Sequence, residues 1–218
     1  MDGLPNPVIL LGVLAVLGLA PFIAIMVSSY LKIVVVLYIL RNALGLQQVP
    51  PNLAVNGLAI ILSVYIMAPI AMEVTDIFRS HDVSMENLGN PALVEAAQKS
   101  LEPVRTFLAK HSDEIERSFF AETTKKMWPE GQAENISHSH FLVLLPAFTV
   151  SQLKAGFETG FLLYLPFVTI DLVVSNILLA MGMMMVSPMT ISLPFKVLLF
   201  VLVDGWTRLI HGLVLSFQ

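Results

Sequence analysis

Residues 161–217, "FLLYLPFVTIDLVVSNILLAMGMMMVSPMTISLPFKVLLFVLVDGWTRLIHGLVLSF", contain two apolar segments that are joined by a methionine-rich loop. Each segment reaches the roughly 20 residues that an apolar helix needs to cross a bilayer. The loop places Met183, Met184 and Met185 in a row directly after Gly182. This pattern predicts an all-α, membrane-type protein with paired hydrophobic helices.

The composition of the whole chain is that of a membrane protein. Apolar residues make up 56% of the chain and charged residues 13%, whereas soluble domains have about 45–50% and about 25%. The net charge of −4 and the absence of basic clusters argue against nucleic acid as a partner. His138 and His140 lack a third metal ligand at suitable spacing, and the sequence has no phosphate loop or hydrolase motif. We therefore expect no enzymatic activity, no cofactor and no metal.

The first 72 residues are predicted to form two hydrophobic helices. The apolar character that begins at Val8 continues to Leu46, so a long kinked helix is expected over about 8–46, with Pro21 as one place for a bend. Such a helix would measure roughly 58 Å at about 1.5 Å per residue, about twice the thickness of a hydrocarbon core. Pro50 and Pro51 end it, and a second helix is expected over about 53–72. Because residues 1–7 carry no positive charge, we expect a retained helix here and not a signal peptide.

Residues 73–150 differ from the rest of the chain because they hold 12 of its 16 acidic and 7 of its 12 basic residues. We expect them to form a small polar helical subdomain that faces water. The last part of the chain, residues 151–218, is the hydrophobic helix pair with its methionine-rich loop. The positive-inside rule applied to Lys32, Arg41 and Lys196 places both connecting loops in the cytoplasm, so the polar subdomain is predicted to be periplasmic.

The last apolar segment, Ile191–Phe217, is only marginally apolar as a whole. Its 16 Leu, Ile, Val and Phe residues favour insertion by about 5–10 kcal/mol, while Lys196, Asp204 and Arg208 oppose it by about 8–10 kcal/mol. These charges therefore need partners. Asp204 and Arg208 are four residues apart and can pair on one helical face, and Asp171 can pair with Lys196 or with a basic group of another subunit.

Two further charged residues stand just before the third apolar segment. Lys154 and Glu158 are four residues apart, and we expect them to form a surface or interface pair. For the charges as a group, the favoured interpretation is that intra- or inter-subunit pairs fix helix register and subunit contacts. One alternative is an ion- or proton-coupled secondary transporter that uses Asp171, and another is contact of these charges with a different partner protein. The surroundings of Asp171 and Asp204 lack the motifs of intramembrane aspartyl proteases.

Two long stretches of the chain carry a resemblance to a known family. "PFIAIMVSSYLKIVVVLYILRNALGLQQVPPN" begins at Pro21, and "LLPAFTVSQLKAGFETGFLLYLPFVTIDLVVSNILLAMGMMMVSPMTISLPFKVLLFVLVDGW" begins at Leu144. Both are similar to the type III secretion export-apparatus family SctR (YscR/FliP), which includes the flagellar relative FliP. One departure is Gln152, where the family often has Glu. The absence of a signal peptide resembles the virulence branch of the family.

The resemblance implies a non-enzymatic pore subunit in the bacterial inner membrane. A family member forms a pentamer with SctS-like and SctT-like subunits in a helical, ring-like export gate, which works with SctU-like and SctV-like components. The gate stands largely above the membrane plane, with its helices folded as hairpins in place of conventional spans, and it conducts unfolded polypeptides. The resemblance further implies that Met183, Met184 and Met185 form a gasket around the closed pore, with Gly182 giving the loop its freedom to turn.

Overall fold

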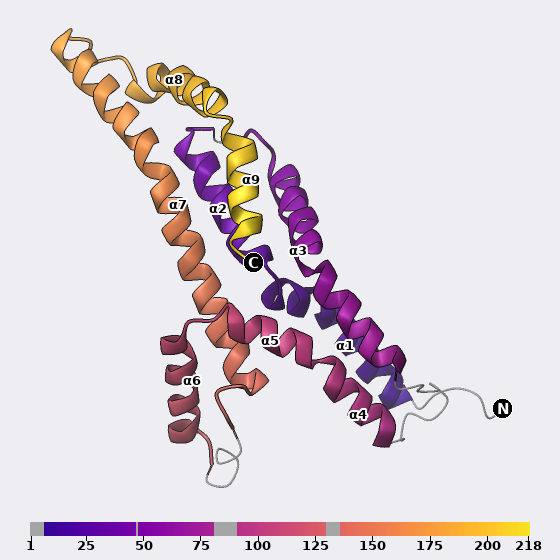
Figure 1. The fold of residues 1–218 in the computed structure, drawn as a ribbon. Coiled ribbons are helices and arrows are strands. Elements are labelled where there is room, and N and C mark those ends of the chain that lie inside the picture. The colour runs from indigo at the N-terminus through magenta and orange to yellow at the C-terminus, as the bar shows by residue number, and fades with distance from the viewer. Residues whose placement is uncertain (1–6, 47, 81–90, 130–135) are drawn as a thin grey trace.

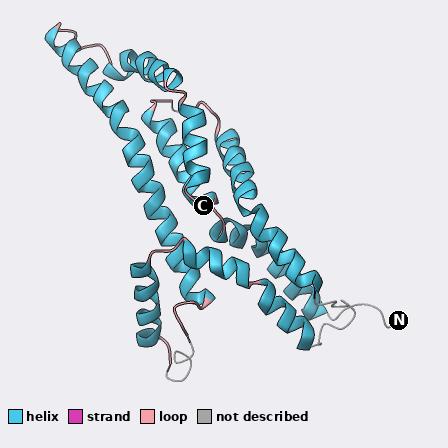
Figure 2. Cartoon of the chain, in the orientation of Figure 1, coloured by secondary structure: helices cyan, strands magenta, loops and turns pink. Residues whose placement is uncertain are grey.

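The computed structural model describes residues 7–46, 48–80, 91–129 and 136–218, and the secondary structure of these residues is helical (Figure 2). The absence of strands from the described residues confirms the all-α prediction. The elements, in chain order, are α1 (Pro7–Val27), α2 (Tyr30–Ala43), α3 (Asn52–Ser80), α4 (Pro91–Ser100), α5 (Glu102–Lys110), α6 (Glu114–Met127), α7 (Phe141–Ala180), α8 (Pro188–Leu202) and α9 (Gly205–Leu215).

The helices form an elongated bundle in which α7 runs along one side, α2 packs against α7, and α3 packs against α2 (Figure 1). Buried side chains of α9 belong to the same core as those of α2. Helix α2 packs most extensively on α7 and next on α3. Its residues Ile33, Val36 and Leu40 are almost completely buried, as are Leu144 and Phe148 of α7. Helices α4 and α5 cross the lower part of the bundle, and α6 packs against the lower part of α7. Helix α8 turns across the opposite end.

Two glycines of α7 allow α2 to approach it closely. Gly156 and Gly160 are four residues apart and face Val35 and Ile39 of α2. A Cβ atom at residue 160 would lie 3.0 Å from Cβ of Ile39 and closer still to its Cδ1. Small residues at this spacing let two helix backbones pack at short range, which is a common device in membrane proteins. The contact between α2 and α7 therefore depends on residues without side chains.

The long helix predicted over residues 8–46 is two helices, α1 and α2, which are bent by 67°. The bend lies at Ser28 and Ser29 and not at Pro21, which α1 accommodates internally. The buried Ser29 donates a hydrogen bond from its Oγ to Oγ of Ser63 in α3, at 3.2 Å. The hydroxyl oxygen of Ser28 accepts from the backbone N–H of Tyr30 at 3.4 Å. These hydroxyls supply local partners at the break, as serines often do where a helix ends.

The predicted apolar segments also differ in extent from the helices. Helix α3 continues to Ser80, and α7 begins at Phe141, so both enter the stretch predicted as the polar subdomain. The last segment is two helices, α8 and α9, bent by 62° at Asp204, whose φ of 52° is left-handed. By length and composition, α3 and α7 could each cross a membrane, and the described residues contain up to four such spans if each bent pair is one span.

Gly160→Ala tests the close contact between α2 and α7. The added Cβ meets Ile39, so we expect overpacking to lower the free energy of unfolding by about 1–3 kcal/mol. Thermal unfolding of the detergent-solubilised chain measures this change. A Cβ at Gly57 of α3 would meet no other atom within 4 Å, so Gly57→Ala is the matched control and should leave stability equal or higher. The double variant Gly160→Ala/Ile39→Ala should recover part of the loss, and an unchanged melting temperature for Gly160→Ala would contradict the contact.

Candidate functional site

The methionine-rich loop begins with a complete helix cap at the end of α7. Gly182 has a φ of +73°, and its N–H donates to the carbonyl of Leu179 at 3.0 Å. The N–H of Met183 donates to the carbonyl of Leu178 at 2.9 Å. This pair of hydrogen bonds is the Schellman arrangement, in which a glycine in the left-handed region ends a helix. Gly182 thus adopts a defined conformation that sets the direction of the loop.

The methionine side chains of this loop project away from the rest of the chain. Met184 is 82% exposed and Met185 is fully exposed, while Met183 is 43% exposed. The loop lies between α7 and α8, at the end of the bundle farthest from α4 and α6 (Figure 1). Exposed apolar side chains in such a group mark a surface that contacts lipid or another protein. Core packing within the single chain does not account for them.

A buried ion pair lies on the two helices that carry this loop. Nζ of Lys196 in α8 is 2.6 Å from Oδ2 of Asp171 in α7. The lysine is 2% exposed, and the aspartate side chain is 30% exposed. Oγ of Ser192 donates to Oδ1 of Asp171 at 2.6 Å, and Nζ of Lys196 also donates to the carbonyl of Ala43 at 3.1 Å. The pair therefore joins α7 and α8 to the C-terminal end of α2.

The position of Ala43 adds to the electrostatics of this site. Ala43 is the last residue of α2, so its carbonyl belongs to the end of a helix, where unpaired carbonyls carry partial negative charge. Lys196 thus has a carboxylate and a helix C-terminus as partners, which offsets the cost of burying an ammonium group. Ser192 and Lys196 are four residues apart and occupy the same face of α8.

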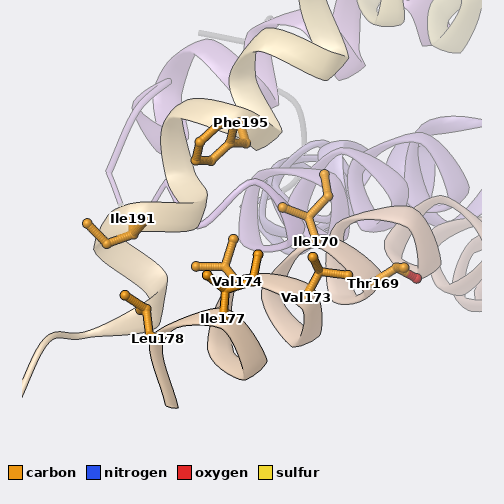
Figure 3. A pocket seen from close by; sticks show the side chains of 8 residues that line it. All are labelled: Thr169, Ile170, Val173, Val174, Ile177, Leu178, Ile191 and Phe195. Atoms are coloured by element: carbon orange, nitrogen blue, oxygen red, sulfur yellow. The ribbon is translucent and has the colours of Figure 1, made fainter. Parts of the chain in front are cut away.

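An apolar groove lies next to the ion pair, between α7 and α8 (Figure 3). Its volume is about 450 Å³. In the close view, Ile191 and Phe195 of α8 face Val174 and Ile177 of α7 across it. The remaining lining residues also come from α7: Thr169, Ile170, Val173 and Leu178. The groove offers hydrophobic side chains from two helices and no charged group.

Two of the predicted charge pairs are not formed as expected within the chain. Asp204 accepts a hydrogen bond from Oγ1 of Thr207 at 3.0 Å, and the ion pairs of the described residues do not join it to Arg208. The reason is local, because Asp204 lies at the left-handed corner where α9 begins. A pair between Asp204 and Arg208 of different subunits stays a prediction.

Lys154 pairs with Asp113, at 3.0 Å between Nζ and Oδ2, and not with Glu158. The reason is that the turn between α5 and α6 packs against α7 at this point. Ser151 accepts from the backbone N–H of Asp113 at 2.8 Å, and Nε2 of Gln152 donates to the carbonyl of His111 at 2.8 Å. An ionised Glu at residue 152 has no hydrogen to donate to that carbonyl, so the departure at Gln152 has a structural role.

His111 itself lies in an aromatic and cationic environment. Its ring centroid is 4.7 Å from that of Phe107 and 5.3 Å from that of Phe217. Burial lowers the pKa of His111, with smaller contributions in the same direction from Lys110 and Lys32. The histidine contacts are thus those of a packed neutral side chain. Within the described ranges, no group of three His, Cys, Asp or Glu residues is arranged to hold a metal ion.

Sequence reasoning identified Asp171 and Lys196 as charges that need partners, and the structure joins them. It missed Ser192, although the spacing of Ser192 and Lys196 on one helical face was an available signal. It also missed the carbonyl of Ala43 and the carboxylate of Asp113, which are separated by 153 and 41 residues from their lysine partners. A single sequence contains no signal for contacts of this kind.

The chain is similar in sequence to known proteins of secretion systems. The FliP family profile matches residues 13–213. The chain is 54% identical to "Yop proteins translocation protein R" of Yersinia pestis, over all of this chain and 99% of that protein. It is 51% identical to "Virulence protein YscR" of Salmonella typhimurium over 98% of both chains. It is 45% identical to "Hypersensitivity response secretion protein HrcR" of Ralstonia nicotianae over 93% of both.

Substitution of one member of the Asp171–Lys196 pair tests how far the pair holds the three helices together. Asp171→Leu leaves a buried ammonium group with only a carbonyl partner, so we expect a loss of about 3 kcal/mol of stability. The double variant Asp171→Leu/Lys196→Met removes both charges and should recover most of that loss. Melting of the solubilised chain measures both. Arg79→Gln, an exposed change on α3, is the control and should alter stability by less than about 0.5 kcal/mol. Equal losses for the single and double variants would show that the pair is not coupled.

Proposed function

The chain belongs to the FliP family and is an SctR-type protein of the type III secretion apparatus, and on this basis we propose that it is a pore-forming core subunit of the export gate. In this role it conducts unfolded polypeptides across the bacterial inner membrane. The exposed methionine loop is the observation that carries the proposal, since it offers an apolar surface that the single chain does not use. A type III secretion apparatus component is a structural part of a larger machine, and its energy comes from elsewhere in that machine.

Met183, Met184 and Met185 form the gasket in this proposal. Methionine is unbranched and flexible, so several copies of the loop can close around an opening and then yield to a passing chain. An apolar constriction excludes water and ions without binding a polypeptide through charge. The fixed cap at Gly182 supports the proposal because it gives every copy of the loop the same starting direction.

The assembly that we propose is a pentamer of this chain, joined by SctS-like and SctT-like subunits and associated with SctU-like and SctV-like components. Apolar side chains are exposed along α1, α7 and α8, which is more than an isolated soluble protein carries. We assign the groove between α7 and α8 (Figure 3) to the neighbouring copy, whose apolar side chains would fill it. The exposed Asp204, Arg208 and Glu158 are available for charge pairs across subunits.

The inner-membrane location is also part of the proposal. Helix α7 has 40 residues, about 60 Å at about 1.5 Å per residue, which is twice the hydrocarbon thickness. A helix of this length has to extend beyond the lipid, so the assembled complex can be raised toward the periplasm. The polar helices α4 to α6 would then lie on the periplasmic side.

We predict that Met184→Ser/Met185→Ser makes the closed complex leak small ions, because the polar side chains admit water to the constriction. The measurement is single-channel conductance of the purified complex in planar bilayers. Both side chains are exposed, so the substitution should not change folding. Met127→Ser on α6, also an exposed methionine, is the control and should stay closed. An intact complex with Met184→Ser/Met185→Ser that conducts no more than the parent would count against the gasket.

The transporter alternative makes a different prediction for Asp171. If Asp171 carried protons, Asp171→Asn would abolish transport while the complex stays assembled, and removing both charges would not help. In the pore proposal the ion pair is structural, so export should follow the amount of assembled complex. We therefore expect Asp171→Leu/Lys196→Met to export substrate better than Asp171→Leu alone. Secretion assays normalised to the quantity of extracted complex distinguish the two functions.

A further inference from the structure

Arg41 is a second cation of the apolar bundle, and it has no acidic partner among the described residues. It lies in the last turn of α2. Its Nη1 donates to Oδ1 of Asn52 and, at 3.4 Å, to the carbonyl of Pro50. The guanidinium lies over the ring of Tyr38, with Cζ 4.9 Å from the centroid. Neutral groups therefore fix its position and leave its charge unbalanced.

The donors of this guanidinium are only partly used. Nε is buried without a hydrogen-bond partner, and Nη2 donates to none of the described residues. A guanidinium has five N–H donors in a planar fork that matches the oxygens of a phosphate or carboxylate. Arg41 is thus positioned by its Nη1 edge and offers the Nη2 edge to an anion from outside the chain.

A cavity of about 300 Å³ adjoins Arg41, between α2, α3 and α9. Arg41 is the charged residue that lines it, and Leu37, Leu58 and Ile210 supply apolar walls. The indole of Trp206 closes the side formed by α9 and packs edge-on against the ring of Phe200, at 5.4 Å between centroids. The site combines one unpaired positive charge with an apolar volume at the low end of the range of small-molecule pockets.

This combination fits an amphiphile with an anionic head. A water-soluble anion would use the charge and leave the apolar walls unsatisfied, whereas a neutral lipid would leave the guanidinium unpaired. We propose that Arg41 and this cavity bind an anionic phospholipid: Nη2 donates to a phosphate oxygen, and part of an acyl chain occupies the volume between Leu58 and Ile210. Tryptophan and arginine are the residues that membrane proteins place at the headgroup level. Anionic lipids of the cytoplasmic leaflet attract basic residues, and the positive-inside rule puts Arg41 on that side.

Native mass spectrometry of the full-length chain, delipidated in mild detergent and then titrated with phosphatidylglycerol or phosphatidylcholine, tests the proposal. We expect saturable binding of phosphatidylglycerol and at least roughly tenfold weaker binding of phosphatidylcholine. Arg41→Gln should weaken phosphatidylglycerol binding by roughly tenfold, since it removes a charge-assisted hydrogen bond. Arg79→Gln, which changes an exposed arginine of α3 outside the cavity lining, is the matched control and should bind as the parent does.

A second variant keeps the charge and removes the space. Ala54 lines the cavity from α3 and is exposed, so Ala54→Leu fills the volume while Arg41 and its contacts stay in place. It should also weaken phosphatidylglycerol binding, and glycerol 3-phosphate at the same concentration should not displace the lipid.

Three results would overturn the proposal. The first is unchanged phosphatidylglycerol binding by Arg41→Gln; if the assembled complex is lost as well, Arg41 is assigned to a carboxylate of another subunit. The second is equal binding of both lipids. The third is displacement by glycerol 3-phosphate, which would show that the cavity contributes nothing. Lipid binding is measured without secretion or conductance, so a negative result here leaves the proposed pore function standing.

Discussion

The burial of Lys196 is the constraint on which the arrangement of the C-terminal half depends. An ammonium group that is 2% exposed in an apolar bundle is tolerated only where strong acceptors surround it. Here the acceptors come from two other helices, the carboxylate of Asp171 and the terminal carbonyl of α2. Helix α8 is consequently held at one register against α7 and α2. The methionine loop connects α7 and α8. Because the Lys196 site fixes these two helices relative to each other, it also determines where the loop lies.

The second constraint is the close approach of α2 and α7. Gly156 and Gly160 bring the two backbones together, which allows α2 to lie within reach of α8 and to present its end to Lys196. Nearer the start of α7, the turn between α5 and α6 is held by hydrogen bonds to Ser151 and Gln152. Helix α7 therefore serves as the common support of the polar helices at one end and the methionine loop at the other. Helix α7 also exposes apolar side chains of its own, as α1 and α8 do.

Much of the fold could be predicted from the sequence because hydropathy reports burial and membrane insertion directly. The apolar segments, the polar middle of the chain and the need for partners at Asp171 and Lys196 all follow from transfer free energies. The family resemblance rests on two long motifs that include most of α2, α7 and α8. The bend at Ser28 and Ser29 and the left-handed Asp204 could not be predicted, because each depends on tertiary contacts or on a single backbone angle. The pairing of Lys154 with Asp113 in place of Glu158 has the same cause, since a turn distant in sequence competes for the lysine.

The hydrogen-bonded cap at Gly182 has a mechanical consequence. Because the backbone leaving α7 is fixed by two hydrogen bonds, deformation of the loop is concentrated in the thioether torsions of its side chains. Rotations of exposed side chains take picoseconds to nanoseconds, whereas collective helix movements take microseconds to milliseconds. In the proposed gasket, a ring of such loops would therefore be stiff at its backbone and deformable at its side chains. Under that proposal, the side chains alone would adapt to the changing width of a passing polypeptide, and no helix would have to move.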